Sequence, residues 1–311
     1  MQWLSKLWPT SSNRDSSSDP EDAQHHRLMR RLRSADRRDW LLRWTLRLLV
    51  LGGLAGATAY WELQTSYFQS IVFSDFAEGA DYHVGEGPSP SIRYPETGPY
   101  NERLGYTRLP GILSHLTDEG WQIDRQARIS NRFAELVDRG IFAPYDEKQR
   151  AGLRIDDPYR SRLHESVYPT RHYTDFEQVP ELVVQTLTFI ENRALLDKDE
   201  PLRNPSLEAD RFLVALWEVA KRELAEGKKP DGASTLATQV EKFRHSPEGR
   251  TENYYDKLQQ MVSASVRTYR DGPETLADQK RIILNYLNGV PLAAVEGFGE
   301  IFGVGDGLHA W

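Results

Sequence analysis

The side chains best suited to chemistry lie in five short segments of the C-terminal half of the chain. The segments read FIENR at 189–193, GASTLATQVEK at 232–242, GRTENYYDKLQQ at 249–260, KRIILNYLN at 280–288 and GFGEIFGVGDGLHAW at 297–311. A glutamate lies in the first, and hydroxyls, amides and lysines lie in the second and third. A carboxylate can act as a general base, and lysines can stabilise negative charge that develops during a reaction.

Several other kinds of chemistry are excluded by the sequence. The chain has no cysteine, which excludes thiolate nucleophiles, disulfides and cysteine-bound zinc. The stretch GFGEIFG lacks the spacing of a dinucleotide-binding fingerprint, and GAS at 232–234 continues into Thr235 and not into the glycine of a serine hydrolase elbow. The eight histidines have no metal-ligand spacing, so no metal site is predicted.

The five segments, taken in their order along the chain, resemble those of the family 51 glycosyltransferases. This family comprises the transglycosylase domain of class A penicillin-binding proteins and their monofunctional relatives. All five segments occur in the family order within residues 176–311. The second segment is the most specific, with matches to G-x-S-T-x-x-x-Q-x-x-K at Gly232, Ser234, Thr235, Gln239 and Lys242. The resemblance implies a mainly α, lysozyme-like domain that polymerises lipid II into β-1,4 glycan strands and releases undecaprenyl diphosphate.

The resemblance also assigns roles to individual residues. Glu191 matches the general base that deprotonates the acceptor's 4-hydroxyl, and Gln260 stands where the family has a second catalytic carboxylate. The positions that would contact diphosphate or sugar are Arg193, Ser234, Thr235, Gln239, Lys242 and Lys257. The alternatives are structural: a carboxylate that closes a helix, hydroxyls that cap a helix, and lysines that lie on a solvated helix face.

The chain departs from the family pattern at several positions. Asn192 replaces an aspartate, Leu195 an aromatic residue and Asn285 a glutamate, while Asp256 and Gln260 stand where the family has arginine and glutamate. Because glutamine lacks the charge of glutamate, it cannot hold a divalent metal strongly. We therefore expect no required cofactor, with Mg²⁺ as an optional ion, and a slow or dormant enzyme that restoration of both residues would accelerate.

Apolar periodicity predicts the helices that carry these segments. Stripes at three- and four-residue steps run through 182–190, 258–269 and 283–287, and Asn204-Pro205 has the form of a helix start that leads to Trp217. The C-terminal domain, 176–311, is therefore predicted to be helical. Residues 111–175 alternate short helix-like and strand-like stretches and predict a small α/β module, and residues 62–110, rich in glycine and proline, predict a linker.

The N-terminal part predicts a membrane anchor. Residues 1–39 form a basic tail, and residues 40–61 at ~1.5 Å each can cross a hydrocarbon core of about 30 Å. Eight arginines between positions 27 and 47 place the N-terminus in the cytoplasm by the positive-inside rule. The prediction is a single-pass protein of the bacterial inner membrane with its main body in the periplasm; a cleaved signal peptide and a buried core helix are the alternatives.

Charge and family together define the expected partners. After residue 47 the chain has 29 basic and 40 acidic residues, so nucleic acid is not expected as a partner. The expected partners are lipid II, the glycan strand and other cell-wall synthesis proteins. Two further functions stay open: an impaired enzyme of the same fold that binds lipid II or a synthase as a regulator, and a structural adaptor that uses residues 77–175.

Overall fold

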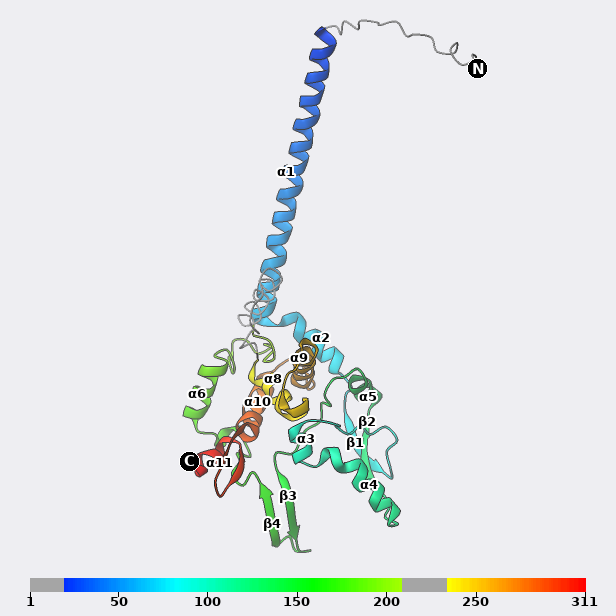
Figure 1. The fold of residues 1–311 in the computed structure, drawn as a ribbon, viewed down its shortest axis with the longest axis vertical. Coiled ribbons are helices and arrows are strands. Elements are labelled where there is room, and N and C mark those ends of the chain that lie inside the picture. The colour runs from blue at the N-terminus through cyan, green and yellow to red at the C-terminus, as the bar shows by residue number, and fades with distance from the viewer. Residues whose placement is uncertain (1–19, 209–233) are drawn as a thin grey trace, which may run out of the picture. The chain divides into compact units, whose positions relative to one another are not determined.

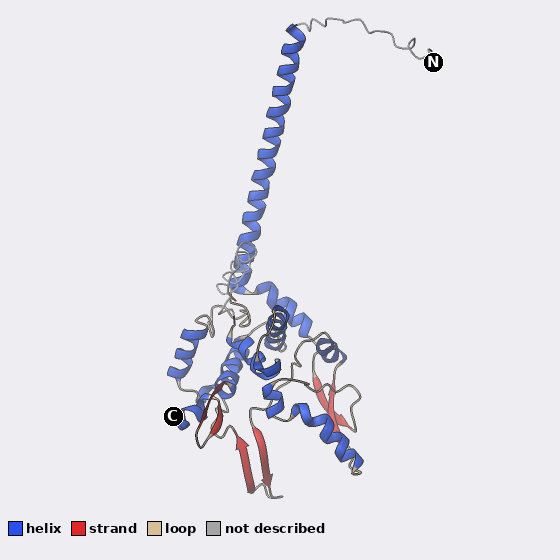
Figure 2. Cartoon of the chain, in the orientation of Figure 1, coloured by secondary structure: helices blue, strands red, loops and turns tan. Residues whose placement is uncertain are grey.

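The computed structural model describes residues 20–208 and 234–311, with side chains from residue 40 onward (Figure 1). About half of these residues are helical, and each described sheet has two strands (Figure 2), which agrees with the predicted mainly α fold. The chain divides into two compact units, Met1–Ala59 and Tyr60–Trp311. The lysozyme-like architecture stays a prediction.

The first helix, α1 (Pro20–Thr65), has 46 residues and contains the predicted span. Within it, Trp40–Thr65 is the stretch of the described chain that is long and apolar enough to cross a membrane, and none of it is buried. The helix also includes residues 20–39 of the predicted basic tail. Orientation in a membrane stays a prediction.

A short helix, α2 (Tyr67–Ala77), follows after Ser66, which has a left-handed backbone (φ 53°). The Glu62 carboxylate accepts hydrogen bonds from the amides of Phe68 and Gln69, both at 2.8 Å, and so caps the start of α2. One face of α2 is buried through Ser70 and Ala77. The other face exposes large apolar side chains, namely Tyr67, Phe68, Ile71 and Val72.

The segment predicted as an irregular linker, 62–110, contains regular elements. Besides α2, it forms the strand β1 (Tyr82–Glu86), the helix α3 (Pro99–Arg103), the 3₁₀ turn η1 (Tyr106–Arg108) and the start of α4 (Leu109–Asp118). Strand β1 pairs antiparallel with β2 (Arg125–Ile129), so pairing crosses the expected boundary at residue 111. The helix α5 (Asn131–Asp138) follows β2, with Ser130 as its N-cap.

The hairpin of β3 (Ala151–Asp156) and β4 (Arg162–Tyr168) precedes the predicted C-terminal domain, 176–311, and η2 (Phe176–Gln178) begins that domain. Then come α6 (Glu181–Glu191), α8 (Leu236–His245), η3 (Pro247–Gly249), α9 (Tyr254–Thr268), α10 (Leu276–Gly289), the hairpin of β5 (Pro291–Val295) and β6 (Gly299–Phe302), and α11 (Val304–Ala310).

The periodic stripes at 182–190, 258–269 and 283–287 fall on α6, α9 and α10, so these three predicted helices are confirmed. The helix predicted from Asn204 onward does not begin there, because Asn204–Glu208 forms turns in which Asn204 Oδ1 accepts the amide of Ser206 at 2.9 Å. The rest of that prediction, and Gly232 and Ala233 of the second segment, lie outside the described residues.

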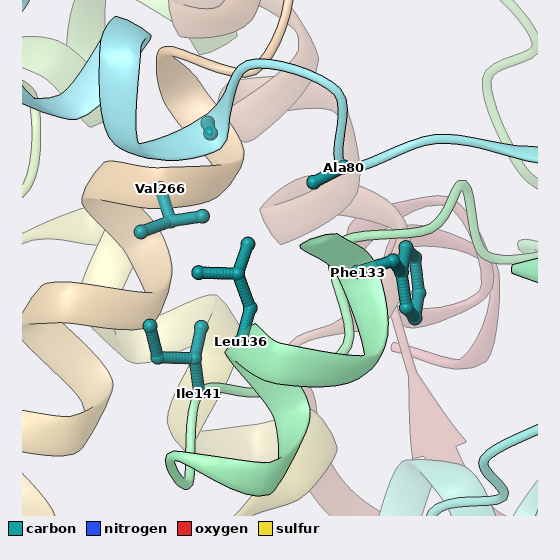
Figure 3. Packing of buried hydrophobic residues seen from close by; sticks show 6 residues of the cluster. Ala80, Phe133, Leu136, Ile141 and Val266 are labelled. Atoms are coloured by element: carbon teal, nitrogen blue, oxygen red, sulfur yellow. The ribbon is translucent and has the colours of Figure 1, made fainter. Parts of the chain in front are cut away.

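Two apolar cores hold these elements together. The first joins the end of α2, α5 and α9; Figure 3 shows Leu136 between Val266 and Ile141, with Ala80 and Phe133 nearby. The second joins α6, α8 and α10 and contains Val179, Leu195, Leu236, Ile283 and Leu287. Burial of one such side chain stabilises the fold by roughly 1.5–3 kcal/mol. The first core therefore links the N-terminal elements to α9.

A buried ionic cluster forms a second link between the N-terminal elements and the helical segment. The Glu147 carboxylate is fully buried, 2.8 Å from Arg244 Nη1 and 2.8 Å from His245 Nε2, both on α8. Arg267 of α9 donates to Glu241 of α8 at 2.7 Å, and its other nitrogens donate to two backbone carbonyls of the loop before Glu147. Burial alone would raise the pKa of Glu147, but His245, Arg244 and Arg267 hold it far below its usual value.

The helix α3 lies close against α8. It follows Gly98, whose φ of 105° favours glycine, and a Cβ at this position would lie 2.1 Å from the carbonyl oxygen of Arg244. Asn101 of α3 donates to Nδ1 of His245 at 3.0 Å, next to the ionic cluster. The close approach of backbone to backbone therefore leaves no room for a side chain here.

Substitution Glu147→Gln tests the cluster. Removal of this charge leaves Arg244 and Arg267 with less compensation in the interior, so the free energy of unfolding should fall by about 3–5 kcal/mol. Denaturant unfolding of the full chain in detergent measures this change. Glu135→Gln, which removes an exposed carboxylate between Arg132 and Arg139, is the matched control and should have little effect. Equal stabilities of the two variants would contradict the assigned role.

Candidate active site

Glu191 is the last residue of α6, where the helix ends because the next residue, Asn192, adopts an extended backbone. Asn192 Oδ1 accepts the amide of Ala194 at 3.0 Å, and Leu195 is buried in the second core. Asn192 and Leu195, which depart from the family pattern, thus serve the fold: Asn192 stabilises a turn and Leu195 packs in the core. The half-buried Glu191 side chain stays at the helix end and lines a cavity of about 320 Å³.

The Glu191 cavity also contains cationic side chains. Arg193 and Arg203 line it together with Gln64. The Arg193 guanidinium lies 4.2 Å from the ring centroid of Phe189, and Arg203 donates to Gln64 at 2.6 Å. Arg193 was predicted from the sequence, whereas Arg203 lies outside the five segments and was missed.

The helix α8 brings the second segment to Glu191. Thr235 is its N-cap and forms a capping box with Thr238, so the Thr235 hydroxyl is 1% exposed and already bonded to the Thr238 amide. This is the structural alternative considered for Thr235. One turn further, Gln239 donates to Glu191 Oε2 at 3.0 Å, which orients the carboxylate. Two of the predicted residues, Glu191 and Gln239, are therefore in direct contact.

Lys242, in the last turn of α8, and Lys257, in the first turn of α9, form a pair of cations. Lys257 Nζ donates to Ser234 Oγ at 2.6 Å, which joins a third predicted residue to the pair. Burial first, and the charge of Lys242 second, lower the pKa of Lys257 to about 8, and burial also lowers the pKa of Lys242. Neither lysine forms an ion pair with a described carboxylate, so an anion would relieve their repulsion.

Gln260 occupies a different environment from the other predicted residues. Its side chain is fully buried, and its amide nitrogen donates to Ser246 Oγ at 2.9 Å and Thr251 Oγ1 at 3.0 Å. It thereby fastens the turn after α8 to α9. It does not line the Glu191 cavity. Its catalytic role stays a prediction that these contacts do not favour.

Asp256, which stands where the family has arginine, caps α9. Its carboxylate accepts the amide of Asn253 at 3.3 Å and the amide of Glu252 at 2.9 Å, while Asn253 accepts the Asp256 amide at 3.0 Å. The pattern Asn-x-x-Asp of this capping box is visible in the sequence, whereas the family pattern shows only that an arginine is lost here. Asp256→Arg would remove this cap at a cost of about 1 kcal/mol, which opposes the gain expected when it is combined with Gln260→Glu.

Helix α10 contributes two residues of the fourth segment, Tyr286 and Asn285, near the candidate site. Burial first, and the charge of Glu191 second, raise the pKa of Tyr286, so this ring lies near the carboxylate. Asn285, in place of the family glutamate, accepts a hydrogen bond from Gln149. In the ranges 20–208 and 234–311 no three His, Asp or Glu side chains are arranged to hold a metal ion.

These contacts define a mainly helical domain with a cavity that is lined by the carboxylates of Glu191 and Glu208 and by the guanidinium groups of Arg193 and Arg203. Residues 160–311 match the model of the Transglycosylase family. The chain therefore contains a transglycosylase domain, consistent with family 51 glycosyltransferases and with peptidoglycan glycosyltransferase-type function in general. No curated protein and no solved structure matches the chain.

The lysine pair predicts a pH dependence of anion binding. An anion binds the protonated form of Lys257, and with a pKa of about 8 that form decreases about tenfold between pH 7 and pH 9. The affinity for inorganic pyrophosphate should therefore fall by about this factor over this range. In Lys257→Arg the charge persists, so titration calorimetry should show a weaker pH dependence; parallel curves for the two proteins would exclude Lys257.

Proposed function

We propose that the chain polymerises lipid II, with Glu191 as the general base for the acceptor's 4-hydroxyl. The observation that supports this proposal most directly is the bond from Gln239 to Glu191, because it joins the first two family segments at one carboxylate. An oriented carboxylate at a cavity wall is what proton abstraction from a sugar hydroxyl requires.

The cations fit the other half of the reaction. As the glycosidic bond forms, negative charge develops on the departing undecaprenyl diphosphate, and positively charged groups already in place stabilise it. Lys242 and Lys257, which lack a described counter-charge, supply such groups from α8 and α9. Arg193 and Arg203 add positive charge at the Glu191 cavity.

The location we propose is the bacterial inner membrane, with the N-terminus in the cytoplasm and the transglycosylase domain in the periplasm. The support is the apolar stretch Trp40–Thr65 of α1 together with the arginines that precede position 47. A lipid-linked substrate would then be reached from an enzyme that is anchored in the same bilayer. Other cell-wall synthesis proteins are the proposed partners.

A regulatory function is the second candidate, and Gln260 is the observation that favours it. A neutral, fully buried amide fastened to Ser246 and Thr251 cannot supply the charge of the family's second carboxylate. A domain with an intact lysine pair and an impaired second position would bind lipid II without polymerising it. A lipid II binding measurement paired with a polymerisation assay separates the two functions.

Substitution Glu191→Gln should abolish polymerisation, because it removes the base and nearly conserves shape. General bases contribute about 10²–10⁴-fold to rate, so fluorescent lipid II should be consumed at least about a hundredfold more slowly. Glu181→Gln at the start of the same helix, where Glu181 accepts a bond from Gln185, is the matched control and should keep the parental rate. Parental turnover by Glu191→Gln would show that another group is the base.

Substitution Gln260→Glu tests whether the unmodified chain is dormant. The hydroxyls of Ser246 and Thr251 can donate to the new carboxylate, and we expect turnover and the response to Mg²⁺ to rise above those of the parent. The comparison is made on the full chain with Gln259→Glu, the neighbouring residue that donates to the Gly140 carbonyl, as control. Rapid, magnesium-dependent polymerisation by the parent, with no gain from Gln260→Glu, would show that dormancy is not a property of this chain.

A further inference from the structure

A second cavity, of about 480 Å³, lies between α3, the turn η3 and the β5–β6 hairpin. It shares no residue with the cavity at Glu191. Its walls are mostly apolar and include the rings of Tyr100, Phe243 and Phe302 and the side chain of Leu292. Arg103, the last residue of α3, also lines it.

Two nitrogens of the Arg103 guanidinium have no polar partner among the described residues. Its carbon lies 3.9 Å from the ring centroid of Phe302 and 4.9 Å from that of Tyr100, so the group is held between two aromatic rings. The Nε and Nη1 atoms are buried and have no hydrogen-bond partner in the part of the chain that the structure describes. The side chain as a whole is partly exposed, so the observation concerns these two atoms, and buried polar atoms are normally hydrogen-bonded.

The other charged groups at the cavity do not satisfy Arg103. Glu300, Glu248 and Arg250 line the same cavity, and all three side chains are exposed. Glu300 is near enough to act on Arg103 through its charge, yet no described carboxylate forms an ion pair with this guanidinium. Rotation of Glu300 toward Arg103 is the competing explanation, and in that case the cavity would need no ligand.

We propose that this cavity binds a small ligand that carries a carboxylate or phosphate on an apolar or ring-shaped body, with Arg103 as the partner of the anion. Two donors of one guanidinium can hold two oxygens of such a group, and the surrounding rings cover an apolar or ring-shaped body. The site joins α3, which precedes the transglycosylase domain, to the hairpin within it. Binding there is separate from chemistry at Glu191.

The test measures the melting temperature of the full chain in detergent with benzoate, phenyl phosphate and neutral benzamide at equal ionic strength. Benzoate carries a carboxylate on a ring and phenyl phosphate carries a phosphate on a ring. At least one of them should raise the melting temperature by about 3 °C at roughly ten times its dissociation constant. Benzamide should not. No response to either anion, or an equal response to benzamide, would overturn the proposal.

Variants locate the response. Arg103→Gln should abolish it, whereas Arg93→Gln, which removes an exposed arginine paired with Asp138, should retain it. An undiminished response in Arg103→Gln would overturn the proposal. Should Arg103→Gln fail to fold, Arg103→Lys keeps the charge between the rings and should show a smaller shift, since lysine cannot bind two oxygens in a planar fork. A full-sized shift in Arg103→Lys would then count against the assigned geometry.

Discussion

The buried carboxylate of Glu147 is the contact on which the arrangement of the helices depends. It lies on the loop between α5 and β3, and it pairs with Arg244 and His245 of α8 and lies near Arg267 of α9. Because Arg267 also binds Glu241, one cluster of charges fixes α8, α9 and the preceding loop together. The lysine pair depends on this arrangement, since Lys242 and Lys257 come from the same two helices.

The site itself combines contacts of opposite character. Between Gln239 and Glu191, and between Lys257 and Ser234, polar groups are satisfied by one another. Lys242 and Lys257 differ from these pairs: burial lowers the pKa of both amines, and the charge of Lys242 lowers that of Lys257 further. Two half-buried cations near each other without a described counter-ion cost stability, and a bound anion would offset that cost.

The sequence predicted those features that depend on local periodicity or on one segment. The apolar steps of α6, α9 and α10 are visible in the chain, and the contact of Gln239 with Glu191 joins two of the five segments. It did not predict the pairing of β1 with β2, because the two strands lie about forty residues apart and a glycine- and proline-rich context obscured the first.

The positions of Gln260 and Asp256 show another limit of sequence reasoning. Comparison with a family identifies a lost charge, but the burial of Gln260 and its bonds to Ser246 and Thr251 depend on a turn from a different helix. Asp256 was within reach, since its capping partner Asn253 is three residues away. Two features could not be predicted because they depend on contacts between distant elements: the two Arg103 nitrogens that have no described partner and the cluster at Glu147.

The exposed face of α2 has a practical consequence for anyone who purifies this protein. In a chain shortened by removal of α1, the side chains of Tyr67, Phe68, Ile71 and Val72 would form an exposed apolar patch. They stay on the surface because α2 packs against α9 with its opposite face. Such a patch promotes self-association in aqueous buffer. A chain shortened to residues 67–311 is therefore expected to need detergent, and aggregation of such a sample would not by itself show that the transglycosylase domain fails to fold.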